Sequence, residues 1–324
     1  MALIRPRTAG MASGLDRSVP ERKSLRGETQ RSAAGLAFPA LILANLVLAA
    51  GPWMVRLADV GPVAAGFWRL ALALPFLAFV ALRQSRGRMS PGWGLIAAVA
   101  VGGLFFAADL AAWHEGIVRT KLANATLFGN CASFLFALYG FVLLRRLPGR
   151  AQALALLLAA IGTALLLGNS FEVSRSHFTG DLLALLAGFF YFLYLVVVDR
   201  ARQAMQPWPV LAIATAAATL PMLLFALWLG ETVMPTDWAP VILLSISSQL
   251  IGQGLLVYAM GHLSPVLVGL CLLTQPVASA LIGWIAYDER LSLGDGVGAL
   301  LICAALVLIR WPGRRLATNE AAAH

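Results

Sequence analysis

Charged residues are scarce in this chain. Asp, Glu, Lys and Arg make up 12% of its 324 residues, whereas about 25% is usual in a soluble globular domain. Hydrophobic residues make up 60% of the chain, and its mean hydropathy is +0.82. The strict alternation of apolar and polar residues that an outer-membrane barrel needs is also lacking. The composition therefore excludes an ordinary soluble domain and predicts an all-α polytopic membrane protein.

Cysteine is rare as well, and Cys131, Cys271 and Cys303 show no C-x-x-C spacing. We therefore expect buried, inert thiols and neither a disulfide framework nor a zinc site. His114-Glu115 does not extend to an HExxH motif, because position 118 is valine. A Walker A motif is also lacking, so ATP does not power a process within this chain. A GxSxG motif, typical of serine hydrolases, is lacking as well. We expect no catalytic residue, no metal and no cofactor.

The apolar runs predict about ten helical spans of roughly 20 residues each. The loops between them are short and rich in Gly, Pro and charge, which leaves no room for a separate soluble domain. The predicted bounds are 34–56, 62–82, 92–114, 122–144, 150–169, 180–199, 208–230, 239–261, 264–286 and 293–311.

The basic residues predict the orientation. With a cytoplasmic N-terminus, eighteen of the 24 Lys and Arg residues lie on the cytoplasmic side and five on the other, and Arg69 lies within the second span. The positive-inside rule then places both termini in the cytoplasm. It also explains the net charge of +9 without nucleic acid as a partner. We expect residues 1–32 to be a disordered basic tail and 313–324 a second cytoplasmic tail; the true start, Met1 or Met11, stays open.

The chain also shows signs of duplication. Arg146-Leu147 and Arg290-Leu291 each precede a closing span rich in Ala, Leu and Gly, and a shift of 144 residues superimposes the two. Five spans are an odd number, so the second half enters the membrane with the opposite orientation, as in many secondary transporters. We place the first repeat at 33–169 and the second at 178–312. The alternative is that Leu/Ala-rich spans resemble each other by composition alone.

Polar residues inside the spans are the candidate functional residues. A charge there costs at least ~2.5–3.5 kcal/mol, so it usually faces protein or water. Helical rise places Arg69, Asp109 and Asn130 at about the same depth, ~10 Å below the outer surface. They form either a pair that staples two helices or a gate for a substrate. Trp113 and His114 lie one turn further out, where His114 either relays protons or sits at the interface.

A second group lies nearer the midplane. Gln249 and Gln253 are four residues apart and share a helix face. Gln275 precedes Pro276, which should free a backbone carbonyl about one turn earlier. Neutral amides suit a polar or zwitterionic organic solute better than a metal ion, although each could alone be an interhelical hydrogen-bond partner. The group consists of Asn45, Tyr191, Gln249, Gln253 and Gln275.

Several short motifs resemble those of a known family. The first half carries Asp109-Leu110, Trp113-His114, the run Ala123-Asn124-Ala125-Thr126-Leu127 and Asn130; the second carries Gly180-Asp181-Leu182-Leu183, Gly252-Gln253-Gly254-Leu255, Gln275-Pro276 and Asp288-Glu289. Over about residues 34–312, the chain resembles the EamA-type transporters of the drug/metabolite transporter superfamily.

This resemblance implies ten transmembrane helices as two inverted five-helix EamA repeats, a central cavity and alternating access. Members are mostly exporters of amino acids, metabolites or drugs in bacterial inner membranes, often proton-linked. The resemblance adds Asn124 to the candidate residues. Two departures stand out: the usual proline of the fourth span is replaced within residues 131–134, and the usual acidic residue closing that span is replaced by Arg145-Arg146. Pro276 and Glu289 are kept.

We therefore predict an inner-membrane secondary transporter that exports small organic solutes, with the lipid bilayer and protons as further partners and a homodimer left open. One rival is a non-transporting sensor or partner subunit, which would need an output surface that the short loops do not provide. Another is an intramembrane enzyme acting on lipids, which would need paired carboxylates or a metal cluster, whereas the spans offer Asp109 alone.

Overall fold

The computed structural model describes residues 35–86, 91–120, 126, 128–145, 147–168, 177–287 and 292–310, and these residues form helices and short connections. Both predicted tails, Asn124 and Glu289 lie outside the described residues. The first helix runs from Gly35 to Leu57 and turns at Ala50. In chain order the further elements are α2 (Gly51–Leu57), α3 (Pro62–Ser85), α4 (Trp93–Ile117), α6 (Cys131–Leu144), α7 (Arg150–Gly168), α8 (Phe178–Arg202), α9 (Pro207–Trp228), α10 (Ala239–Leu244), the π-helix η1 (Ser245–Gln253), α11 (Gly254–Met260), α12 (Pro265–Leu272), α13 (Thr274–Tyr287) and α14 (Leu293–Arg310).

Seven of the described helices are long and apolar enough to cross a membrane, so the chain is a multi-pass membrane protein. Three further apolar helices are shorter within the described residues: Cys131–Leu144, Arg150–Leu165 and Leu293–Ile309. They coincide with the fourth, fifth and tenth predicted spans. The total of ten spans therefore stays a prediction.

Proline starts several of these helices. Pro62, Pro207 and Pro265 are the first residues of α3, α9 and α12. Proline suits this position because its backbone angle is preset and its missing N–H would have no helical partner there. At α12 the preceding Ser264 adds a cap, since the N–H of Leu267 donates to its hydroxyl oxygen over 3.4 Å. The loop chemistry thus sets the helix starts.

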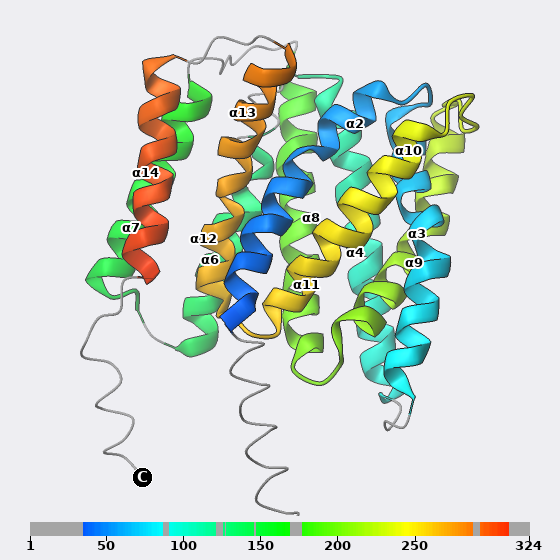
Figure 1. Cartoon of the computed structure of the whole chain (residues 1–324), viewed down its shortest axis with the longest axis horizontal. Helices are drawn as coiled ribbons and strands as arrows, with labels where there is room; N and C mark the ends of the chain where they lie inside the picture. Colours follow the sequence, from blue (N-terminus) through cyan, green and yellow to red (C-terminus); the bar gives the residue numbers. More distant parts are fainter. Residues whose placement is uncertain are drawn as a thin grey trace, which may run out of the picture. The chain divides into compact units, whose positions relative to one another are not determined.

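Many helix pairs join the two halves of the chain, among them α4 with α8 and α9, and three of these pairs are α3 with α9, α6 with α12, and α7 with α14. Each of these three pairs links corresponding predicted spans, the second with the seventh, the fourth with the ninth and the fifth with the tenth. Figure 1 draws α7 and α14 side by side. A pseudo-two-fold relation between the halves would bring corresponding helices together in this way.

Glycines allow two of these contacts to be close. A Cβ atom on Gly269 of α12 would lie 2.6 Å from the backbone oxygen of Ser133 in α6. A Cβ atom on Gly162 of α7 would lie 2.7 Å from the carbonyl oxygen of Gly298 in α14. Backbone atoms cannot turn aside as a side chain can. The small residues therefore set the helix separation, as is common in membranes.

The buried side chains form two clusters. The larger core spans the first helix, α3, α4, α8, α9 and the segment α10–η1–α11, and it takes in Phe136 of α6 and part of α12; Phe106 and Tyr194 are among its largest members. The smaller core joins α6, α7, α12 and α14 and consists of Phe141, Ala155, Ala159, Val266, Leu270, Leu273 and Ala305.

The predicted burial of all three cysteines is wrong for Cys303, which is exposed on α14, and holds fully for Cys271. An apolar thiol can face lipid as easily as protein.

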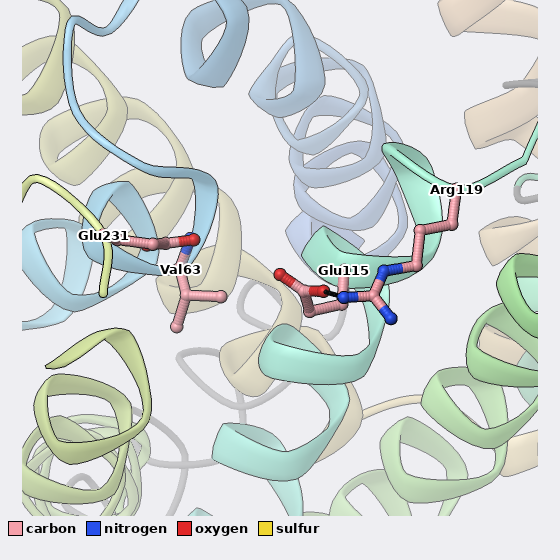
Figure 2. Close-up of polar contacts among 4 residues, drawn as sticks. All are labelled: Val63, Glu115, Arg119 and Glu231. Carbon is pink, nitrogen blue, oxygen red and sulfur yellow. Dashed lines mark hydrogen bonds and ion pairs between the residues drawn. The ribbon is translucent and has the colours of Figure 1, made fainter. Parts of the chain in front are cut away.

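A loop of the second half is tied to the start of α3. Glu231 accepts hydrogen bonds from the N–H groups of Val63 and Ala64, at 3.2 and 2.7 Å, and Figure 2 shows the first of them. Burial raises the pKa of Glu231, and these backbone hydrogen bonds oppose the shift. The indole N–H of Trp68 also donates to the carbonyl of Val233 over 2.6 Å.

Asp59 makes the matching contact from the first half. It accepts hydrogen bonds from the hydroxyl and N–H groups of Thr236 and from the N–H of Asp237. The hydrogen bond from the Thr236 hydroxyl is the largest cause that lowers the pKa of Asp59. We call residues 59–64 and 231–237 together the interhalf loop contact.

Candidate functional site

A cavity of about 210 Å³ lies among the first helix, α3, α4, α6, α8, α12 and α13. Its lining combines apolar and polar side chains, as ligand sites usually do. Eight of the residues singled out from the sequence line it: Arg69, Asp109, Trp113, His114, Asn130, Tyr191, Gln253 and Gln275. The structure thus brings together residues from both halves.

Arg69 is held on α3 by a residue of the second half. Its Nε donates to Oε1 of Gln249 over 3.2 Å, and its guanidinium lies 5.7 Å from the ring centre of Phe106. Gln249 in turn donates through Nε2 to the hydroxyl of Thr215 over 2.9 Å. Gln249 is fully buried and does not line the cavity. Its position behind Arg69 makes it a residue that orients the guanidinium.

Asp109 faces the same cavity from α4. Within the described part of the chain, no ion pair of 4.0 Å or less joins it to Arg69. Both side chains line the cavity, and they do not contact each other directly. No direct contact between Arg69 and Asp109 therefore supports the interpretation that they staple two helices together. Both groups remain available to a ligand.

His114 is buried, with 4% of its surface exposed. Its Nδ1 has no hydrogen-bond partner among the described residues. The ring is thus packed among protein groups at the cavity, and whether it relays protons stays a prediction. Trp113 packs against Gly129 at the start of α6, and Asn130 donates to the carbonyl of Thr126 over 2.7 Å.

Amide groups link the halves at and behind the wall of the cavity. Asn45 donates through Nδ2 to the carbonyl of Cys271 over 2.7 Å, and Gln275 donates through Nε2 to Oδ1 of Asn45 over 3.2 Å. The helix is interrupted at Leu273, between α12 and α13, close to the place that Pro276 predicted. The carbonyl of Cys271 is bound by side chains, including the Thr274 hydroxyl at 2.7 Å. Asn45 itself is fully buried and positions Gln275.

The π-helix η1 was not predicted from the sequence. It spans Ser245–Gln253 and contains both glutamines of this segment. Single π turns are rare and occur often at functional sites. Gln253 lines the cavity and accepts from the Tyr194 hydroxyl over 3.5 Å, whereas Gln249 is directed to Arg69 and Thr215.

Further lining residues were missed by the sequence interpretation. Arg56 and Trp53 of α2, Ser133 of α6 and Ser279 of α13 all border the cavity. In the sequence analysis, Arg56 served only as one of the basic residues that predict the membrane orientation. Serines in apolar helices give little signal, because they commonly bond to their own helix backbone.

Comparisons with known proteins agree with this architecture. The family model described as the EamA-like transporter family matches twice, over residues 35–168 and 178–311. An uncharacterized transporter of Archaeoglobus fulgidus is 23% identical over 279 residues, which cover 83% of this chain and 95% of that protein. A solved crystal structure superposes with a TM-score of 0.72 at 22% identity, covering 88% of this chain and 99% of that chain. At this identity, the crystal structure supports the fold alone.

Proposed function

The chain belongs to the EamA-like transporter family of the drug/metabolite transporter superfamily, and from this membership we propose that it moves small organic solutes by alternating access through the cavity at Arg69 and Asp109. The two family matches and the transporter-named relative point to a transporter rather than an enzyme. We further propose that residues 33–169 and 178–312 act as the two inverted repeats.

The observation that carries the proposal is the pair of opposite charges in one cavity. The guanidinium of Arg69 suits a carboxylate, and the carboxylate of Asp109 suits an ammonium group. Gln253, Gln275 and Asn130 add neutral hydrogen-bonding groups. At about 30 Å³ per water molecule, the cavity of about 210 Å³ has room for a small solute. We infer a polar or zwitterionic substrate of amino-acid size.

Direction, coupling and location are parts of the same proposal. We propose that both termini are cytoplasmic, because the basic residues are biased to one side; from family membership we further propose export across a bacterial inner membrane. Asp109 is the candidate for proton coupling, since a desolvated carboxylate can exchange its proton as a cavity opens and closes. A substrate ammonium and a proton would then compete for the same carboxylate.

The test is efflux from proteoliposomes loaded with a mixed panel of amino acids and metabolites, with and without an imposed pH gradient. We expect selective loss of one chemical class, accelerated by the gradient and reduced at least about tenfold in Asp109→Asn. Asp295→Asn is the matched control, since Asp295 lies in the first turn of α14. Wild-type efflux by Asp109→Asn, from protein shown to be inserted, would refute the assigned role.

A further inference from the structure

A second, apolar recess lies on the opposite face of α4. Its floor is formed by Ala107, Ala108, Ala111 and Ala112, and its volume is about 670 Å³. The walls come from α8 and α9, which both pack on α4 but have few contacts with each other. We call this recess the α4 groove.

The dimensions of the α4 groove fit one lipid chain. From Leu104 to Arg119, helical rise gives a length of about 22 Å. Half of a ~30 Å hydrocarbon core is about 15 Å, so the groove spans one leaflet and reaches the headgroup level. The alanine floor leaves room beside the bulky walls formed by Phe190 and Phe225.

One end of the α4 groove carries charge. Glu115 and Arg119 form an ion pair one helical turn apart, drawn in Figure 2. Arg119 is 49% exposed and Glu115 12% exposed. Trp228 at the end of α9 lines the same groove and is 76% exposed. Arginine and tryptophan together are typical of the membrane–water interface.

The surroundings of this pair are acidic. The charge of Glu115 is near enough to act on Glu231, and the Thr120 hydroxyl donates to Asp181 over 2.6 Å. The guanidinium of Arg119 is thus paired with Glu115, and two further carboxyl groups lie nearby: Glu231 close to Glu115, and Asp181 at the hydroxyl of Thr120, which follows Arg119 in the chain. Such a field favours a headgroup that offers an ammonium as well as a phosphate, and disfavours a headgroup of net negative charge.

We propose that the α4 groove binds one zwitterionic phospholipid with a primary ammonium, of the phosphatidylethanolamine class. One of its two acyl chains lies on the alanine floor and the other faces the bilayer, while its phosphate contacts Arg119 and its ammonium contacts Glu115. Because Asp109, Trp113 and His114 line the cavity on the other side of α4, the bound lipid would support the helix that carries them. The lipid site itself does not depend on transport.

The experiment measures lipid retention by the full chain. The protein is reconstituted in vesicles of equimolar phosphatidylethanolamine and phosphatidylglycerol with identical acyl chains, extracted in mild detergent and analysed by mass spectrometry. We expect one retained phosphatidylethanolamine per chain, at least about fivefold enriched over phosphatidylglycerol. Ala108→Phe, which fills the floor, should abolish the enrichment. Ala97→Phe is the matched control, because Ala97 is exposed on α4 outside the groove.

Two charge variants separate headgroup recognition from chain packing and keep the test informative if Ala108→Phe fails to fold. Arg119→Gln should lower retention of both lipids, whereas Glu115→Gln should remove the preference for phosphatidylethanolamine. Equal retention of both lipids by the wild type would overturn the proposal, as would unchanged retention in a folded Ala108→Phe. A dimer that excludes lipid from the groove would overturn it as well.

Discussion

The larger core buries acidic and basic side chains, whereas the buried polar groups of α6 and α7, which border the smaller core, are hydroxyls. Among the described residues, the buried acidic and basic groups are His114 of α4 and Asp181 and Asp199 of α8, all on helices of the larger core. On α6 and α7, the buried polar side chains are Ser133 and Thr163. The two regions differ in charge rather than in apolar character.

The same division runs across the cavity. Its acidic and basic lining residues, Arg56, Arg69, Asp109 and His114, come from α2, α3 and α4, which we call the ionisable wall. The wall formed by α6, α12 and α13 contributes neutral groups such as Gln275. A desolvated charge must be held in place by partners, whereas glycine contacts between neutral helices depend on shape alone. Substitutions on the two walls should therefore have different consequences.

The largest difference should appear in transport. Arg69→Gln removes a charge from the ionisable wall, and we expect substrate efflux to fall at least about tenfold, because charge-assisted hydrogen bonds are the strong ones. Ser279→Ala on the neutral wall should change efflux by about two- to fivefold at most. Initial efflux rates from proteoliposomes of matched protein content measure both. Equal losses would remove the distinction between the walls.

Glycine contacts should control stability in both regions. Gly269→Ala drives a methyl group against the α6 backbone, and Gly103→Ala drives one against the backbone of Ala214 in α9. We expect each to lower the free energy of unfolding by about 1–3 kcal/mol, the usual cost of overpacking. Thermal unfolding in detergent measures the effect.

The control for these variants is Gly94→Ala. No atom lies within 4 Å of a Cβ placed on Gly94, so the greater helix propensity of alanine should leave stability unchanged or higher. If Gly269→Ala is as stable as Gly94→Ala, the close approach of α12 to α6 does not limit the fold.

A smaller effect should come from behind the ionisable wall. Gln249→Ala leaves Nε of Arg69 without its partner, and we expect a several-fold rise in KM as the guanidinium loses its orientation. Thr215→Val retains Gln249 but removes its acceptor, so the rise should be smaller. Concentration dependence of efflux measures KM. A fall in maximal rate with KM unchanged would contradict an orienting role.

Depth along each helix could be predicted from the sequence. Arg69, Asp109 and Asn130 were expected at one level because helical rise is constant, and all three line one cavity. The two EamA repeats follow from motifs of the same chain. The positions of the helices could be predicted because long apolar runs are a strong and local signal.

The direction in which a side chain points around its helix could not be predicted in the same way. Gln249 contacts Arg69 across 180 residues, and Asn45 contacts Cys271 across 226. Which face of a helix meets which neighbour depends on tertiary packing, and hydropathy is nearly uniform around a buried span. The π-helix η1 changes the phase of Gln249 relative to Gln253, which a regular four-residue spacing does not anticipate.

The smallest predicted effect concerns the interhalf loop contact and its two acids. Hydrogen bonds lower the pKa of Asp59, so its contribution to stability is present above the unfolded pKa and lost as pH falls through the folded one. Burial raises the pKa of Glu231, so its contribution is full below the unfolded pKa and lost as pH rises through the folded one. We therefore expect the Tm advantage of the wild type over Asp59→Asn to shrink as the pH is lowered. For Glu231→Gln we expect the opposite: lowering the pH should raise the Tm of the wild type relative to that of the variant. Thermal unfolding between about pH 3 and pH 8 brackets both carboxyl groups. Parallel pH profiles for the two variants would mean that the halves are joined there by backbone contacts alone.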